Sequence, residues 1–235
     1  MNQVDLPARN SEESVLTPEM RRLLEGFSET PLYEEYRLAG GTSMAVVLGH
    51  RRSRDLDFFP DVCNGRVPRD RIRSVLDRIA EKVDYLLVHD SEVTAMADGV
   101  KVIFSGYPYE WREKPLYRSG IRLADPREVM CMKAYILDRR STARDYIDIR
   151  YGLREGASTL DLVIEDSKQK FILDGEVQFS GKRFLQQLLY VDDISEEDKQ
   201  SATEELLDPR VTFDDIVADL REYVHDYMKC KGNGR

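Results

Sequence analysis

Residues 38–59, LAGGTSMAVVLGHRRSRDLDFF, constrain this chain more than any other stretch. The segment opens on a short apolar run, turns on two adjacent glycines, continues with apolar residues at helical spacing, and ends on an Asp-Leu-Asp triplet followed by two phenylalanines. Adjacent glycines allow backbone conformations that a Cβ would forbid, and they mark a turn between regular elements. The order of these signals predicts a strand, a glycine turn, a helix and a second strand.

Both ends of this stretch carry groups suited to chemistry. A helix that begins directly after Gly40 and Gly41 points free N–H groups at whatever lies there, and a phosphate fits such a site. Asp55 and Asp57 are two residues apart, so a strand places both carboxylates on one face and Leu56 on the other. Two converging carboxylates can hold a hard cation such as Mg²⁺. Each signal alone has a plainer interpretation, a simple turn or a solvated strand edge.

Composition indicates a soluble globular protein. The chain has 235 residues, 41% hydrophobic and 34% charged, which is enough for one large domain or two small ones. No run approaches the ~18 apolar residues of a membrane span, and the first residues do not read as a signal peptide, so we expect a cytoplasmic protein with no membrane partner. The three cysteines are widely spaced and predict neither a disulfide framework nor a zinc site, with Cys131 expected in the core.

The charge is unevenly distributed. The net charge is −9, yet residues 37–154 carry 22 basic and 17 acidic side chains, whereas residues 1–36 carry 3 and 8 and residues 155–235 carry 10 and 19. A basic centre between acidic flanks is compatible with a phosphate-bearing ligand, and solvated charged faces are the equal alternative.

The remaining elements are predicted from periodicity and from capping and turn signals. Helices are expected at about 18–29, 68–80, 125–140 and 144–153, strands at 83–89, 92–97 and 100–104 with a hairpin at Asp98-Gly99, and helical segments at 160–167, 181–190 and 211–228, with an acidic connector at 191–205. The aromatic run 106–111 either packs over the sheet edge or stacks on a base, and packing is the favoured alternative.

Together, the glycine turn and the carboxylates resemble the GG[ST]-x(9–13)-Dx[DE] signature of the DNA polymerase β-like nucleotidyltransferase superfamily. The wording of 38–59, and the pattern LADPREVMCMKAYILDRRSTARDYIDI further on, resemble one branch, the AbiEii/AbiGii toxin family. The resemblance covers about residues 36–153. It implies an α/β (α+β) fold with a nucleotidyltransferase-like mixed sheet core flanked by helices (1–124) and a helical region (125–235), whose motif-bearing helices at 125–153 precede an acidic helical tail at 154–235.

The resemblance also implies roles for particular residues. The turn residues would cradle a nucleoside triphosphate, namely Gly40, Gly41, Thr42 and Ser43. Asp55 and Asp57 would hold Mg²⁺, with Mn²⁺ as an alternative ion. Lys133, Asp145 and Asp148 would be catalytic, with Lys133 on the exposed side of its helix and neutralising phosphate charge. From the place of the basic cluster just before the carboxylates, we expect one or more of Arg51, Arg52 and Arg54 to face the nucleotide or the acceptor, with Arg51 and Arg54 assigned to the nucleotide together with Arg140.

Two of these assignments have structural alternatives. The basic cluster at 50–54 is equally well a solvated connection. The charged side chains around Lys133 are, in the alternative, an ion-pair network between helices, made by Lys133, Arg140, Arg144, Asp145 and Asp148.

One departure from the superfamily pattern bears on activity. The superfamily places a third carboxylate on the strand beside Asp-x-Asp, and Ile103 stands at that position here.

The family implies a Mg²⁺-dependent transfer of a nucleoside monophosphate from an NTP to an acceptor hydroxyl, by the toxin of a type IV toxin–antitoxin pair, with tRNA as acceptor and a cognate antitoxin as partner. The alternatives are transfer to a small molecule of the antibiotic type, and a degenerate protein that binds nucleotide without turnover.

Overall fold

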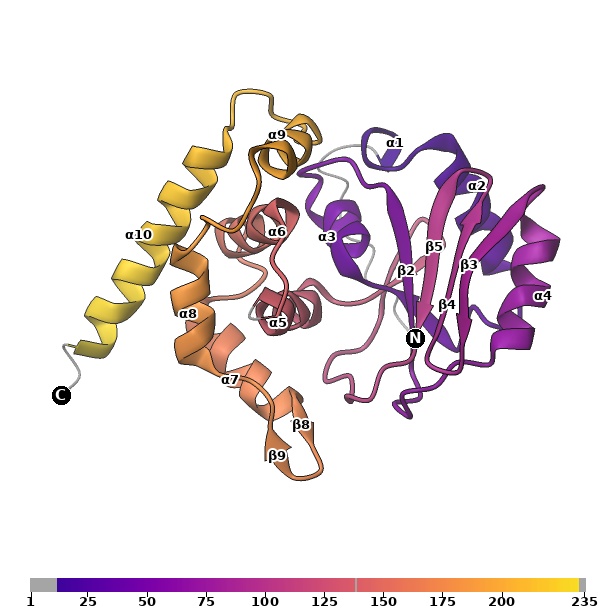
Figure 1. The fold of residues 1–235 in the computed structure, drawn as a ribbon, viewed down its shortest axis with the longest axis horizontal. Coiled ribbons are helices and arrows are strands. Elements are labelled where there is room, and N and C mark those ends of the chain that lie inside the picture. Colours follow the sequence, from indigo (N-terminus) through magenta and orange to yellow (C-terminus); the bar gives the residue numbers. More distant parts are fainter. Residues whose placement is uncertain (1–11, 138, 233–235) are drawn as a thin grey trace. The chain divides into compact units, whose positions relative to one another are not determined.

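The computed structural model describes residues 12–137 and 139–232 (Figure 1). The chain divides into two compact units, one that ends at Asp125 and one that begins at Pro126. The division expected from the sequence lies one residue earlier, between 124 and 125.

The first unit is built on a mixed sheet of seven strands. Its order is β3-β4-β5-β2-β1-β7-β6, with β2 parallel to β5, β1 parallel to β7, and the other neighbours antiparallel. The strands are β1 (Tyr36–Leu38), β2 (Asp55–Pro60), β3 (Val83–His89), β4 (Glu92–Ala97), β5 (Val100–Ser105), β6 (Leu116–Arg118) and β7 (Ile121–Leu123). The expected α/β class with a mixed sheet is confirmed, and β6 and β7 are strands that the periodicity did not indicate.

Four helices of the described part accompany the sheet. They are α1 (Glu12–Val15), α2 (Pro18–Ser28), α3 (Gly40–Leu48) and α4 (Arg69–Ile79). The start of α2 follows the predicted signal, because the Thr17 hydroxyl accepts the Met20 N–H at 3.2 Å and Pro18 takes the first helical position.

The core of the first unit explains the orientation of β2. Phe58 lies 4.5 Å from Phe27 of α2 and 4.8 Å from Phe104 of β5, measured between ring centroids. Leu56 and Phe58 are 1% and 4% exposed. Burial of these two side chains on one face of β2 leaves Asp55 and Asp57 on the other face.

The aromatic run after β5 packs against the protein. Trp111 donates its Nε1–H to the Pro60 carbonyl at 2.9 Å, the Arg37 guanidinium lies 4.3 Å from the Trp111 ring centroid, and Tyr107 contacts both Phe59 and Trp111. The packing alternative therefore holds in this structure.

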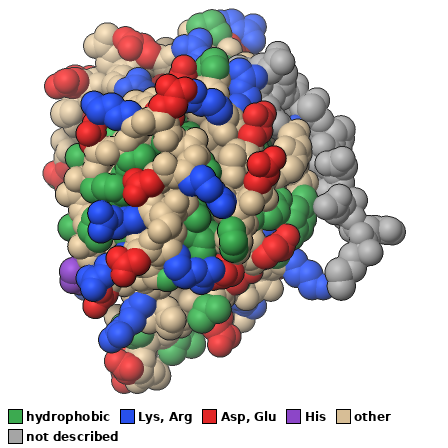
Figure 2. Space-filling model, turned by 90° about the vertical axis from the view of Figure 1, so that its right-hand side faces the viewer, with side chains coloured by type: hydrophobic (Ala, Val, Ile, Leu, Met, Phe, Trp, Pro, Cys, Tyr) green, Lys and Arg blue, Asp and Glu red, His purple; other side chains and the backbone are tan. Residues whose placement is uncertain are grey.

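The outer face of α4 and β3 carries mixed charge (Figure 2). Basic, acidic and apolar side chains are interspersed there, and basic residues of α4 are paired, Arg69 with Asp90 at 2.9 Å and Arg71 with Glu35 at 2.6 Å. On this face, Arg69 and Arg71 of the basic central region form solvated ion pairs.

The second unit is helical with one short hairpin. Its elements are α5 (Pro126–Leu137), α6 (Ala143–Arg154), α7 (Leu160–Lys170), β8 (Ile172–Leu173), β9 (Glu176–Val177), α8 (Gly181–Leu189), α9 (Glu196–Glu204) and α10 (Phe213–Gly232). The segment 191–205, predicted as an acidic connector, contains the helix α9, which is capped by the Ser195 hydroxyl. Of the residues of α9 only Ala202 is buried, so no apolar stripe marks the helix.

Packing in the second unit joins α5 to α7. Tyr135 stacks on Phe171 with ring centroids 4.1 Å apart, and the fully buried Lys170 ammonium lies 2.5 Å from the Glu128 carboxylate. Cys131 is buried, as expected from its place in an apolar helix. Within residues 12–137 and 139–232, no helix combines the length and the apolar character needed to cross a bilayer.

Candidate active site

The candidate site of the first unit begins at the start of α3. Gly40 is the first residue of the helix and has a φ of +60°, in the left-handed region. The preceding Ala39 has no side chain that could cap the helix, and the first N–H groups of any α-helix lack intrahelical acceptors. The N-cap residue of α3 therefore contributes no side-chain cap to the helix end that carries the two glycines.

Asp57 lies directly against this N-terminus. A Cβ built on Gly40 would lie 2.6 Å from Oδ2 of Asp57, closer than real Cβ atoms approach other heavy atoms, and 3.3 Å from its Cγ, which is also a tight contact. The backbones are also joined, since the Ala39 N–H donates to the Asp57 carbonyl at 2.8 Å. Two features therefore require glycine at position 40: its left-handed backbone angle, and the Asp57 carboxylate that occupies the space of a Cβ.

Asp55 and Asp57 share a face of β2, as predicted. The pair is half-buried, and exposure alternates along the strand with the buried Leu56 and Phe58. In the parallel pairing with β5, Asp55 lies opposite Lys101 and Asp57 opposite Ile103. The residue of β5 opposite Asp57 is therefore the aliphatic Ile103, as the sequence indicated. Among the residues that the structure describes, no group of three or more His, Cys, Asp or Glu is placed to hold a metal ion.

Thr42 and Ser43 are structural through their hydroxyls. Thr42 is 1% exposed and its Oγ1 donates to the Asp55 carbonyl, while Ser53 Oγ lies 2.5 Å away. The fully buried Ser43 donates to the Ala124 carbonyl at 2.8 Å. These hydroxyls tie α3 to β2 and to the end of β7, so a ligand at this turn would meet backbone N–H groups.

The basic cluster after α3 is divided between interior and surface. Arg51 is 3% exposed and donates to the Arg52 carbonyl at 3.0 Å, whereas Arg54 is exposed one residue before Asp55. Within this cluster, Arg52 and Arg54 are therefore on the surface and Arg51 is in the interior.

Lys133, Asp145 and Asp148 meet within the second unit. Lys133 Nζ lies 2.7 Å from Asp145 Oδ1 and 2.9 Å from Asp148 Oδ2, and the exposed fractions of the three side chains are 12%, 8% and 0%. Asp145 also caps α6, because its Oδ2 accepts the N–H and the hydroxyl of Thr142 at 3.0 and 2.9 Å. The expectation that Lys133 lies on the exposed side of its helix is wrong. Of the alternative ion-pair network between helices, the part made by Lys133, Asp145 and Asp148 is present.

Two arginines of that proposed network lie elsewhere. The Arg144 guanidinium binds Glu205 through two bonds of 2.7 and 2.6 Å. Arg140 is exposed and follows the end of α5 at Leu137, so it does not share a helical stripe with Lys133. The predicted helix continued to residue 140, and its end is earlier because no apolar periodicity extends beyond Leu137.

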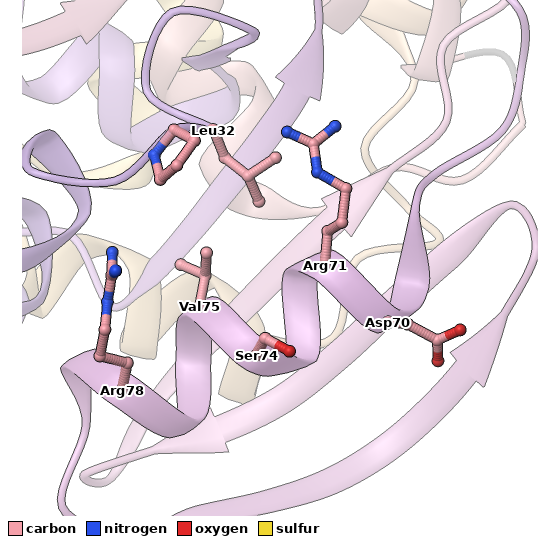
Figure 3. A pocket seen from close by; sticks show the side chains of 7 residues that line it. Leu32, Asp70, Arg71, Ser74, Val75 and Arg78 are labelled. Atoms are coloured by element: carbon pink, nitrogen blue, oxygen red, sulfur yellow. The ribbon is translucent and has the colours of Figure 1, made fainter.

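The first unit also has a pocket of about 390 Å³ (Figure 3). Its lining comes from the α2–β1 connection and α4, and consists of Pro31, Leu32, Asp70, Arg71, Ser74, Val75 and Arg78. None of the predicted site residues of the first unit belongs to this lining.

Known proteins are similar to this chain in sequence and in fold. Residues 22–228 match the family described as the nucleotidyl transferase AbiEii toxin of type IV toxin–antitoxin systems. This chain belongs to the AbiEii family. It is therefore a nucleotidyltransferase of a toxin family, and the resemblance of its glycine turn and carboxylates to that family is confirmed.

Individual relatives of this AbiEii protein are distant. An uncharacterized protein of Aquifex aeolicus is 29% identical over 188 residues, which is 77% of this chain and 86% of the relative. The crystal structure of JHP933 from Helicobacter pylori aligns over 92% of both chains with a TM-score of 0.54 and 17% identity. MenT4, a nucleotidyltransferase toxin of Mycobacterium tuberculosis, aligns over 86% of this chain and 79% of its own with a TM-score of 0.55 and 17% identity. At this identity the two structures show a common fold.

Proposed function

We propose that this AbiEii protein transfers a nucleoside monophosphate from a nucleoside triphosphate to an acceptor hydroxyl, with a divalent cation held by Asp55 and Asp57. The observation that carries the proposal is the contact of the Asp57 carboxylate with Gly40. Through this contact, the strand that carries both carboxylates lies against the N-terminus of α3, whose N-cap residue has no capping side chain. The carboxylates attract a hard cation and the helix N-terminus a phosphate.

The donor set fits Mg²⁺, with Mn²⁺ as an alternative ion. Both ligands are half-buried carboxylates on one face of β2, and the buried Leu56 and Phe58 lie on its other face. A bound Mg²⁺ would neutralise charge that develops on the phosphates. The N–H groups at Gly40, Gly41 and Thr42 would bind phosphate oxygens, and the absence of a Cβ at Gly40 allows the Asp57 carboxylate to lie against the same stretch of backbone.

The remaining roles rest on the family resemblance. Within the second unit, Lys133 would supply positive charge and Asp145 and Asp148 would hold its ammonium in place, which their distances of 2.7 and 2.9 Å support. Arg54 is a better candidate than Arg51 for a contact with the nucleotide, because it is exposed beside Asp55. Arg140 is accessible as well.

For the acceptor we propose tRNA, and for a partner a cognate antitoxin, since the family consists of toxins of type IV systems. The net charge of −9 favours a second candidate, a small hydroxyl compound, because nucleic-acid affinity depends strongly on cationic contacts. The nucleotide site would be the same in both cases.

Calorimetry tests the nucleotide site. Titration of a non-hydrolysable triphosphate analogue should show Mg²⁺-dependent binding, and the double variant Asp55→Ala, Asp57→Ala should lose it. The matched control, Asp70→Ala with Asp84→Ala, removes two carboxylates from α4 and β3 and should keep it. A folded Asp55/Asp57 variant with unchanged Mg²⁺-dependent binding would refute the proposal.

Label transfer tests the acceptor. The protein is incubated with Mg²⁺ and each α-labelled nucleoside triphosphate, either with total tRNA or with a panel of hydroxyl-bearing small molecules. Label on tRNA that depends on Asp57 supports the toxin activity. Label on a small molecule alone supports the second candidate.

A further inference from the structure

Lys101 stands on the same sheet face as the two carboxylates. The parallel register pairs it with Asp55, as it pairs Ile103 with Asp57. Paired residues of neighbouring strands project to one face, and the strands lie about 4.8 Å apart. Lys101 and Ile103 are half-buried, as the two aspartates are.

Lys101 is paired with Asp55 in the strand register, but its ammonium is not bound to the Asp55 carboxylate. In the described part of the chain, neither side chain takes part in an ion pair within 4.0 Å or in a hydrogen bond. Both charges therefore remain available to a ligand on this face. Lys101 differs in this respect from Lys133, which two carboxylates hold.

The charges of this face limit the number of cations it can bind. Asp55 and Asp57 together carry two negative charges, which one divalent cation balances. The β5 residues opposite them are a lysine and an isoleucine, so neither supplies an oxygen ligand. A second divalent ion would lack a side-chain ligand from β5 and would be repelled by the Lys101 ammonium.

We propose that Lys101 binds the triphosphate and supplies the positive charge that a second metal ion would otherwise provide, so that the site takes one divalent cation per bound nucleotide. The inference rests on the proposed function, because it assigns a residue to the same site. A lysine ammonium is a compact point charge that binds phosphate oxygens well. Its aliphatic stem can lie along Ile103 while the charged end reaches the ligand.

Mn²⁺ binding, measured from the electron paramagnetic resonance signal of the free ion, tests the number of cations bound per nucleotide and the role of Lys101. With a saturating non-hydrolysable triphosphate analogue, and after subtraction of the Mn²⁺ that the free analogue binds in a protein-free control, the wild type should hold one Mn²⁺ per bound nucleotide. In Lys101→Met, Mn²⁺ affinity without nucleotide should rise, because a repelling charge is gone. Affinity for the analogue with Mn²⁺ should fall about tenfold, the effect of losing one modest charged contact.

Two variants serve as controls. Lys101→Arg keeps the charge and should leave both affinities near those of the wild type. Lys82→Met removes a lysine with 77% exposure at the start of β3 and should change neither. A loss of folding would lower both affinities together, so the opposite changes expected for Lys101→Met report on charge.

The outcomes separate this inference from the proposed function. Two Mn²⁺ ions per nucleotide in the wild type, or unchanged affinities in Lys101→Met, would overturn the role of Lys101 while Asp55 and Asp57 remained necessary. Mn²⁺ binding that survives in the folded Asp55→Ala, Asp57→Ala variant would overturn the proposed function itself.

Discussion

Replacement of Gly40 by alanine tests the contact on which the proposed site depends. A Cβ at a φ of +60° costs roughly 1–2 kcal/mol in the left-handed region. The new Cβ would also lie 2.6 Å from Asp57 Oδ2, and overpacking of this kind costs typically about 1–3 kcal/mol. We therefore expect Gly40→Ala to lower the free energy of unfolding of the first unit by roughly 2–5 kcal/mol, the sum of the two effects. Mg²⁺-dependent nucleotide binding should be lost as the carboxylate is displaced.

Two comparisons separate the effects. Gly99 has a φ of +83° and open space around its Cβ position, so Gly99→Ala should cost only the backbone strain of roughly 1–2 kcal/mol and leave nucleotide binding intact. In an Asp57→Ala background the clashing Oδ2 and Cγ are gone, and the nearest remaining Asp57 atom is its Cβ at 3.4 Å. The cost of Gly40→Ala should then shrink by about 1–3 kcal/mol.

Urea unfolding followed by tryptophan fluorescence makes this measurement on the correct unit. Trp111 is the single tryptophan of the chain, and it packs on Phe59 and Tyr107 in the first unit. Additive effects of Gly40→Ala and Asp57→Ala would show that the contact does not exist. So would a cost of Gly40→Ala no greater than that of Gly99→Ala.

Three further predictions concern the rest of the chain. Lys133→Met should lower the free energy of unfolding by roughly 3–5 kcal/mol in urea titrations, because it leaves the fully buried Asp148 without its cation. Lys199→Met, which breaks a pair with an exposed glutamate, should cost at most about 1 kcal/mol, and equal costs would contradict the network. Ile103→Asp should increase the Mn²⁺ count per nucleotide from one to two, since it adds a carboxylate on β5; an unchanged count would show that no second ion fits. Cys131 should resist a thiol reagent in the native protein, because burial raises the pKa of its thiol to about 11, whereas the exposed cysteine near the C-terminus should react; equal rates would contradict this.

The parts of the site that sequence could predict are those set by local periodicity. The two-residue spacing of Asp55 and Asp57 determines that they share a strand face, and the glycine pair marks the start of α3. The position of Ile103 follows from the same alternation once β5 is placed beside β2. These features depend on neighbours in the chain and on one strand pairing.

The parts that sequence could not predict depend on distant contacts. Thr42 and Ser43 suit a phosphate cradle by residue type, but Ser43 is bound to the carbonyl of Ala124, far along the chain. The burial of Lys133 depends on α6, which supplies both of the carboxylates that hold it. Lys101 is the missed residue: alternation along 100–104 places it with Ile103, but only the register with β2 shows that it faces Asp55.

The parallel pairing of β2 with β5 also has a consequence for folding. The hairpins β3–β4 and β4–β5 close through short turns, and such local contacts form quickly. The pairing of Asp57 with Ile103 must instead close a loop that contains α4, β3 and β4, and β1 acquires its second neighbour only when β7 is present. During synthesis, the strand that carries the carboxylates therefore gains its second neighbour only after residues 100–105 have left the ribosome, and β1 gains its own second neighbour only after residues 121–123. A growing chain of this toxin family should remain without a formed nucleotide site for the first half of its translation.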